Sequence, residues 1–199
     1  MEYDKGDLVW FDPGLGYVLP GEVIEFHRAG QVITVQAVIG GKSQVFTLTN
    51  LSSVRRRQDL GQEGVNDLST LSDLNEASLL WNLKIRYDKE QIYTYTGSIL
   101  VSVNPYKMFD IYGLDAVKRY EGQILGTLPP HIFAIGSACY SRLGKDHRAQ
   151  CCVISGESGA GKTEATKLIM QYLAAVNKSA SNLITEQILE ASPLLESFG

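Results

Sequence analysis

The sequence has few cysteines, no excess of basic charge and no long apolar run. Three cysteines among 199 residues are too few, and too unevenly spaced, for a disulfide framework or a cysteine zinc site. A formal net charge of −4 excludes the basic surplus of proteins that wrap nucleic acid. No apolar run is long enough for a membrane span, and the acidic N-terminus has no signal-peptide core. These absences favour a cytoplasmic protein that binds no nucleic acid and spans no membrane.

Short alternating segments separated by turn residues fill the first quarter of the chain. Segments at 8–11, 17–26, 31–38 and 44–48 alternate as strands do, and the second is expected to break at Pro20-Gly21. Four or five such strands predict a small SH3-like β-barrel over residues 1–52. The run ArgArgArg (55–57) and the glycines after it predict a solvated linker at 53–66. Residues 67–199 then form a second domain.

Helical and strand-like segments alternate in this second part. Apolar residues at Ala77, Leu80, Leu83 and Tyr87 predict an amphipathic helix. Further elements are predicted in this order: two strands meeting at Thr96-Gly97, a helix at 114–120, a helix at 131–143 that begins at His131 behind two prolines, and a buried strand at 150–155. One of Cys151 and Cys152 on that strand is expected to face the core, and a redox role is disfavoured.

A complete G-x-x-x-x-G-K-[ST] motif follows the predicted strand at 150–155. Its residues are Gly156, Glu157, Ser158, Gly159, Ala160, Gly161, Lys162 and Thr163. The apolar residues after the motif fall on one face of a helix: Ala165, Leu168, Ile169, Tyr172, Leu173 and Val176. Strand, glycine loop and helix in this order predict a site for a nucleoside triphosphate, and a chance glycine turn is the alternative.

The chemistry of this motif is electrostatic. Glycines let the backbone curl so that its N–H groups face the phosphates, and the next helix adds partial positive charge at its start. Lys162 is the predicted catalytic residue because its charge would reach the β- and γ-phosphates of ATP. The Thr163 hydroxyl is the predicted ligand of Mg²⁺.

The glycine motif and three further segments resemble the myosin motor head. The run GlyGluSerGlyAlaGlyLysThrGluAlaThrLys (156–167) resembles its phosphate loop, and 92–107 resembles the segment that ends in its purine-binding loop. Residues 129–135 resemble the helix start that follows, and 188–199 the helix before the first nucleotide switch. The pattern at 104–112 is most similar to the tail-bearing myosins of class seven or fifteen.

This resemblance implies an incomplete α/β P-loop NTPase domain and a motor that couples ATP hydrolysis to movement on actin. It also implies a cytoskeletal location, calmodulin-like light chains on the full-length protein, and a set of nucleotide-binding residues beyond the glycine motif: Asn104, Pro105, Tyr106, Lys107 and Tyr112. Asn104 and Tyr112 are expected near the adenine. Actin is expected to bind through parts that these 199 residues do not include.

Two other readings stay open at this stage. Because no switch residues follow the glycine motif, a truncated form is expected to hydrolyse no ATP alone and to act as a nucleotide-binding or interaction module. An unrelated phosphate-loop enzyme such as a small-molecule kinase is disfavoured, because residues 164–199 contain no arginine for a lid.

Overall fold

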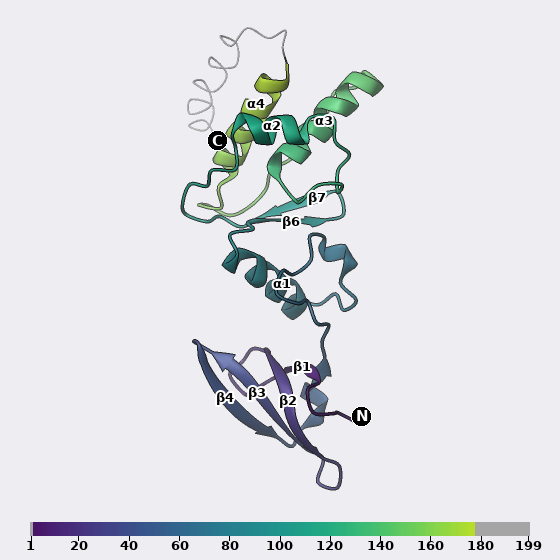
Figure 1. Ribbon diagram of the computed structural model, residues 1–199, viewed down its shortest axis with the longest axis vertical. Helices are drawn as coiled ribbons and strands as arrows, with labels where there is room; N and C mark the ends of the chain where they lie inside the picture. Colours follow the sequence, from purple (N-terminus) through teal and green to yellow (C-terminus); the bar gives the residue numbers. More distant parts are fainter. Residues whose placement is uncertain (1, 178–199) are drawn as a thin grey trace. The chain divides into compact units, whose positions relative to one another are not determined.

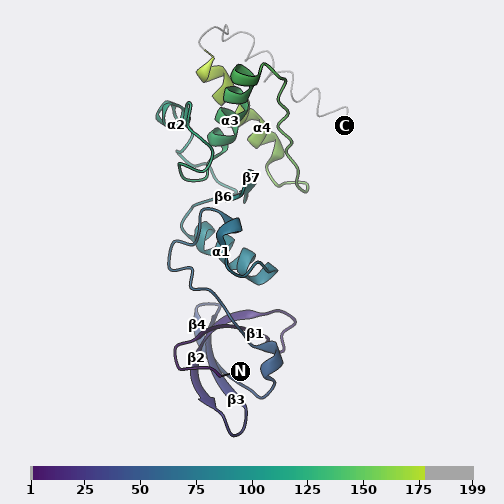
Figure 2. The same ribbon diagram turned by 90° about the vertical axis from the view of Figure 1, so that its right-hand side faces the viewer.

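The computed structural model describes residues 2–177, which fall into two units divided between Arg86 and Tyr87. Figure 1 and Figure 2 show their elements in two perpendicular views. The domain boundaries that the sequence predicts after residues 52 and 66 stay a prediction. The helix expected at 188–199 lies outside the described residues. None of the helices within residues 2–177 has the length and apolar character needed to cross a membrane.

An antiparallel sheet of five strands occupies the first unit. The strands are β1 (Leu8–Phe11), β2 (Leu19–His27), β3 (Val32–Ile39), β4 (Lys42–Leu48) and β5 (Arg55–Arg56), in the spatial order β4-β3-β2-β1-β5. Two short 3-10 helices, η1 (Leu51–Ser53) and η2 (Leu68–Thr70), flank β5. Val9, Phe11 and Ile33 are fully buried in the core of the sheet. The strands expected at 8–11, 31–38 and 44–48 are confirmed within two residues, and the sheet is consistent with the predicted SH3-like region.

Strand β2 runs through Pro20 and Gly21, so the break predicted there is wrong. Pro20 pairs with Trp10 of β1, and the ladder between β2 and β3 begins only after Gly21. The missing N–H of proline therefore interrupts no bond to β3. A β-carbon on Gly21 would lie 2.3 Å from a methyl carbon of Val35 and 2.8 Å from the Phe11 ring. Glycine stands here because the strand passes close to its neighbours, and not because the chain turns.

The sequence predicts a solvated connector at the three consecutive arginines, and the structure shows Arg55 and Arg56 exposed but Arg57 half-buried. Arg55 and Arg56 form β5 and pair with β1. The guanidinium of Arg57 lies 5.8 Å from the ring centroid of Trp10 and 5.9 Å from that of Trp81. These two indole rings meet edge to face, with centroids 6.3 Å apart. Cation–π contact and the apolar stem of arginine explain why Arg57 lies against the fold.

Helix α1 (Glu76–Asp88) forms where the sequence predicts a helix, but it buries a different face. Leu80 and Tyr87, which the prediction placed on the buried face, are exposed. The buried side chains are polar and four residues apart: Ser78, Asn82 and Arg86. The Asn82 amide accepts a bond from the N–H of Val65 at 2.7 Å and donates to the carbonyl of Val65 at 3.1 Å. Polar contacts with the preceding loop thus orient this helix.

The described part of the second unit, residues 87–177, contains one strand pair and three helices. Its elements are β6 (Tyr93–Thr96), β7 (Ile99–Ser102), α2 (Leu114–Tyr120), α3 (Ile132–Asp146) and α4 (Lys162–Val176), and each was expected from the sequence. Helices α3 and α4 lie side by side (Figure 1, Figure 2), and Gly136 of α3 faces the ring of Tyr172 of α4. The predicted apolar face of α4 is confirmed, since Ile169, Tyr172 and Val176 are buried.

The buried strand predicted at 150–155 is not formed. Strands β6 and β7 pair with each other, and no further strand occurs between residues 103 and 177. Val153 is 83% exposed, and both Cys151 and Cys152 are exposed as well. A continuous apolar run becomes a buried strand only when strands flank it and helices cover its faces. Here the segment has helices beside it and no flanking strand, so the inward-facing cysteine expected there is also wrong.

Candidate functional site

The motif at 156–163, called the glycine loop below, ends in the first two residues of α4. Gly159 (φ 79°) and Gly161 (φ 92°) adopt left-handed conformations that side chains with a β-carbon rarely take. Gly161 is the residue immediately before the helix. The first N–H groups of a helix have no partner within it, so they carry partial positive charge. The glycines thus place the loop against an electropositive helix start.

Lys162, the first residue of α4, folds its side chain back across the glycine loop. Its Nζ donates to the carbonyl oxygens of Gly156 at 2.8 Å and Glu157 at 2.9 Å. Lys167, one turn further along the same helix, instead pairs with the carboxylate of Glu164 at 2.9 Å. Both partners of the Lys162 ammonium are neutral. Anionic oxygens are stronger acceptors, so they can displace these two carbonyls.

Asn104 connects the glycine loop to a segment far away in the sequence. Its Nδ2 donates to the carbonyl of Gly159 at 2.8 Å, and its Oδ1 accepts from the N–H of Tyr106 at 3.0 Å. A β-carbon on Gly161 would come within 3.9 Å of the Asn104 amide. The structure therefore places Asn104 against the glycine loop, which brings the predicted site residues of two separate segments together.

The residues that follow Asn104 in the 104–112 segment do not contact the glycine loop in the way that Asn104 does. Tyr106 is 85% exposed and adopts a left-handed conformation with φ of 51°. Lys107 forms an ion pair with Glu90, and its Nζ lies 5.0 Å from the ring centroid of Phe109. The charge of Lys107 is thus directed at Glu90 rather than at the glycine loop. Pro105, between Asn104 and Tyr106, is half-buried.

Tyr112 at the end of the segment belongs to an aromatic cluster. Its hydroxyl shares a hydrogen bond of 2.8 Å with that of Tyr93, and its ring lies 5.6 Å from the His131 ring and 6.0 Å from the Phe133 ring, centroid to centroid. Burial raises the pKa of Tyr112 above its usual range. Its hydroxyl therefore stays protonated and acts as a hydrogen-bonding group.

His131 holds this segment to α3. Its Nδ1 accepts from the N–H of Phe133 at 3.1 Å and caps the helix, as the expected helix-start role requires. The proton is therefore assigned to Nε2, which donates to the carbonyl of Ile111 at 3.1 Å. Burial lowers the pKa of His131 to about 4, so the ring is neutral near pH 7. The ring also stacks on Tyr120 at a centroid distance of 4.8 Å.

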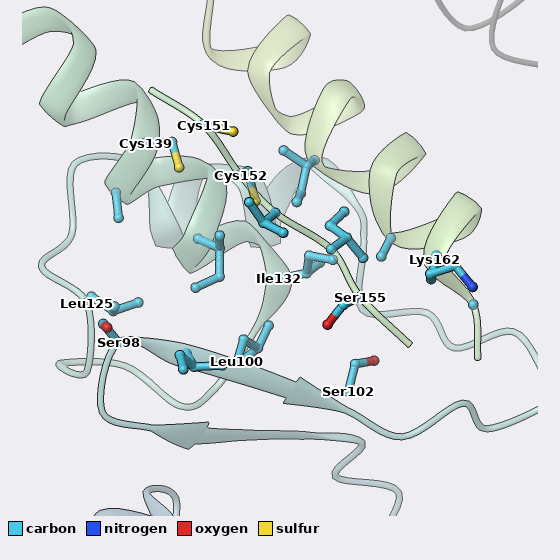
Figure 3. A pocket seen from close by; sticks show the side chains of 18 of the residues that line it. Ser98, Leu100, Ser102, Leu125, Ile132, Cys139, Cys151, Cys152, Ser155 and Lys162 are labelled. Atoms are coloured by element: carbon cyan, nitrogen blue, oxygen red, sulfur yellow. The ribbon is translucent and has the colours of Figure 1, made fainter. Parts of the chain in front are cut away.

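A cavity of about 390 Å³ lies beside the glycine loop (Figure 3). Residues from β7, α3, the 150–155 segment and the start of α4 line it. Its polar and ionisable lining includes Arg142, Ser155, Lys162 and the three cysteines. Of the predicted site residues, Ala160, Gly161 and Lys162 reach it. Within the described part of the chain, the 104–112 segment contributes nothing to its lining.

The described residues offer no ready-made metal centre. No group of three or more His, Cys, Asp or Glu side chains suited to a metal ion occurs within residues 2–177. Magnesium is usually held by one or two protein oxygens together with phosphates and water. Thr163, the second residue of α4, is the predicted protein oxygen. Such a shell fits a metal that arrives with its nucleotide.

Sequence reasoning missed several partners of the site residues. Glu90 pairs with Lys107, although nothing in the pattern around Glu90 marks it. The contact between Asn104 and Gly159 spans 55 positions, so no local periodicity could reveal it. Tyr93 was predicted only as a strand residue. Its hydroxyl contacts that of Tyr112 because the chain between them folds back, which the local sequence pattern does not show.

Comparison with known proteins identifies similar sequences. A family model described as myosin head (motor domain) matches residues 65–199. Unconventional myosin-VIIb of Mus musculus is 47% identical over 197 residues, which are 98% of this chain and 9% of that protein. Unconventional myosin-XV of Homo sapiens is 51% identical over 158 residues, 79% of this chain and 4% of that protein. Myosin-VIIa of Drosophila melanogaster is 45% identical over 195 residues, which are 98% of this chain and 9% of that protein. The chain spans less than a tenth of each relative.

Proposed function

Because this chain belongs to the myosin head (motor domain) family, we propose that it supplies the ATP-binding part of an actin-based motor. In this proposal the glycine loop and the helices around it belong to a P-loop NTPase domain within residues 67–199, and residues 1–52 form an SH3-like barrel before it. ATP binding and hydrolysis in the whole motor drive movement on actin filaments, in the cytoplasm and on the cytoskeleton. Calmodulin-like light chains are proposed partners of that whole motor.

The position of the Lys162 ammonium is the observation that carries the ATP proposal. It bridges the carbonyls of Gly156 and Glu157 at the start of α4, within the loop that phosphates would occupy. On binding, phosphate oxygens take the place of these two carbonyls, and the ammonium gains anionic acceptors. Backbone N–H groups of the glycine loop and of the first turn of α4 supply further donors.

The magnesium and adenine subsites follow from the neighbouring residues. The Thr163 hydroxyl would hold Mg²⁺, which neutralises part of the phosphate charge when bound. The adenine is proposed to lie along the 104–112 segment, against Asn104, Pro105, Tyr106, Lys107 and Tyr112. The ring of Tyr106 is exposed and can pack on a base, while Asn104 fixes the segment to the glycine loop.

Equilibrium titration with a fluorescent ATP analogue tests the proposal. A cation about 4 Å from a phosphate oxygen interacts by roughly 4 kcal/mol at an effective dielectric constant near 20. After desolvation, Lys162→Ala is expected to lose about 2–3 kcal/mol, which weakens binding by about 30- to 150-fold. Lys167→Ala is the matched control, because Lys167 lies on the same helix and pairs with Glu164. Equal affinity of Lys162→Ala and the unaltered chain would refute the phosphate site.

A further inference from the structure

Two buried polar side chains, His131 and Tyr93, lie among the apolar residues of the second unit. His131 is the residue immediately before α3, and Tyr93 is the first residue of β6. Their rings meet edge to face, with centroids 5.5 Å apart. Burial of a polar group is costly unless that group is hydrogen-bonded. The bonds that these two side chains form therefore account for their presence in an apolar core.

Each of the two side chains bonds one of the last two residues of the 104–112 segment. Nε2 of His131 donates to the carbonyl oxygen of Ile111 at 3.1 Å. The hydroxyl of Tyr93 shares its hydrogen bond of 2.8 Å with the hydroxyl of Tyr112. Phenylalanine or leucine could fill the same space but could form neither bond. The far end of the segment is thus fixed to the start of α3 and to β6 by specific polar contacts.

We propose that His131 and Tyr93 are positioning residues of the adenine subsite, which raise the affinity for the base without affecting that for the phosphates. This rests on the proposed function, because the subsite is the one proposed along the 104–112 segment. Asn104 holds the other end of that segment to the glycine loop. A segment fixed at both ends has less conformational freedom to lose when a base packs on the exposed ring of Tyr106.

The phosphate site is held by contacts at the opposite end of the segment. Nζ of Lys162 bonds the carbonyls of Gly156 and Glu157. Asn104 bonds the carbonyl of Gly159. Loss of the bonds to Ile111 and Tyr112 leaves all of these contacts in place. Binding of the base and binding of a triphosphate without a base should therefore respond differently.

Isothermal titration calorimetry of the whole chain tests this difference. The two ligands are ATP and inorganic tripolyphosphate, which carries three phosphates and no base, each with magnesium. Tyr93→Phe removes one hydroxyl and keeps the ring, so its affinity for ATP should fall by about 3- to 10-fold. Its affinity for tripolyphosphate should stay within about 2-fold of the value for the unaltered chain. Lys162→Ala, in contrast, should weaken both ligands alike.

Two amide variants of His131 separate the bond to Ile111 from the cap on α3. Counted in bonds from the α-carbon, the side-chain oxygen of asparagine matches Nδ1, and the amide nitrogen of glutamine matches Nε2. His131→Asn keeps the acceptor that caps α3 but loses the donor to Ile111, so ATP should bind about 3- to 10-fold more weakly. His131→Gln keeps the donor and loses the cap, so it should bind ATP more tightly than His131→Asn although it is less stable to denaturant. A purely structural role predicts the same order for affinity and stability.

Three outcomes overturn the assignment. The first is that either Tyr93→Phe or His131→Asn binds ATP as tightly as the unaltered chain does. The second is that these variants weaken ATP and tripolyphosphate by the same factor, as a general loosening of the fold would. The third is that His131→Gln binds ATP no better than His131→Asn. Circular dichroism checks that each variant keeps its helices, and His147→Asn is the control because His147 is exposed.

Failure of the proposed function gives a different result. The unaltered chain then binds neither ATP nor tripolyphosphate, or Lys162→Ala leaves both affinities unchanged, and the positioning role is refuted with it. If Lys162→Ala weakens both ligands while Tyr93→Phe and His131→Asn weaken neither, the phosphate site stands and only the positioning role is refuted.

Discussion

The side-chain amide of Asn104 donates a hydrogen bond of 2.8 Å to the carbonyl oxygen of Gly159. The oxygen of the same amide accepts from the N–H of Tyr106 at 3.0 Å. One side chain thus fixes the conformation of its own segment and holds it to the glycine loop. An amide is needed because the two contacts require one donor and one acceptor.

Replacement of Asn104 should weaken binding of ATP without unfolding the chain. Asn104→Ala loses two hydrogen bonds of modest net value, about 1 kcal/mol each, so the affinity should fall by roughly 5- to 30-fold. Asn104→Asp should be worse, because its carboxylate faces the Gly159 carbonyl and the proposed phosphates. Titration with a fluorescent ATP analogue measures both. Met108→Ala is the control, since Met108 lies on the same segment and is 87% exposed. An affinity order that places Asp above Ala would count against the role of the amide donor.

Thr163→Ala should produce a defect that depends on magnesium. The variant removes the proposed hydroxyl ligand of Mg²⁺ and leaves Lys162 in place. Its affinity for ATP should approach that of the unaltered chain when magnesium is removed by a chelator, and fall below it when magnesium is present. Thr163→Ser retains the hydroxyl and should behave as the unaltered chain does. The magnesium assignment fails if Thr163→Ala shows the same deficit with and without the metal.

Gly136→Ala should destabilise the packing between α3 and α4. The added β-carbon would lie 2.7 Å from Cδ1 of Tyr172, whose side chain is 1% exposed. Overpacking costs about 1–3 kcal/mol, which outweighs the gain of up to about 1 kcal/mol in helix propensity. Gly144→Ala on the same helix meets no atom within 4 Å and should be neutral or stabilising. Denaturant unfolding followed by circular dichroism compares the two variants, and equal effects would contradict the close approach at Gly136.

Acid should destabilise the second unit through His131. Its folded-state pKa of about 4 lies below the ordinary value of 6.5, so between these values the unfolded chain binds a proton that the folded chain does not. The free energy of unfolding should therefore fall as the pH drops from about 6.5 to about 4, by on the order of 3 kcal/mol, and this contribution should be constant above that range.

A histidine variant separates this effect from the titration of carboxylates. His131→Asn keeps an oxygen that can cap α3 but cannot titrate, so its stability should depend less on pH over the same interval. His147→Asn is the control, because His147 is exposed and its left-handed conformation suits asparagine. Denaturant midpoints measured near pH 7, 5.5 and 4.5 give the comparison. An unchanged pH dependence in His131→Asn would rule out the buried neutral ring as the cause.

The sequence correctly predicted the helices and strands that are determined by the pattern of neighbouring residues. The face formed by Ile169, Tyr172 and Val176 repeats at helical spacing, and it is buried as expected. Strands β6 and β7 meet at Thr96-Gly97, where β-branched and aromatic residues give way to a glycine with φ of 58°. The family was also predicted correctly, because the glycine motif and the other segments occur in a fixed order that composition alone does not produce.

Contacts between residues that are far apart in the sequence explain why some predictions were wrong. Asn82 is polar and fully buried because its amide completes the backbone bonds of Val65, a pairing that apolar periodicity cannot indicate. Arg57 was read as solvated, since a run of charge carries no sign of the indoles that cover it. The segment at 150–155 has the composition of a buried strand, but composition does not supply flanking strands. In each case the tertiary partner decided the outcome.

The edge-to-face pair of Trp10 and Trp81 has a consequence for spectroscopy. These are the two tryptophans of the whole chain, and both belong to the first unit. Tryptophan fluorescence therefore reports on the five-stranded sheet and α1, and does not report on the glycine loop. Far-ultraviolet circular dichroism, in contrast, includes the two 15-residue helices α3 and α4 of the second unit. A melt recorded by both methods separates the two units without any label, and the gap between the curves measures how independently each unit melts.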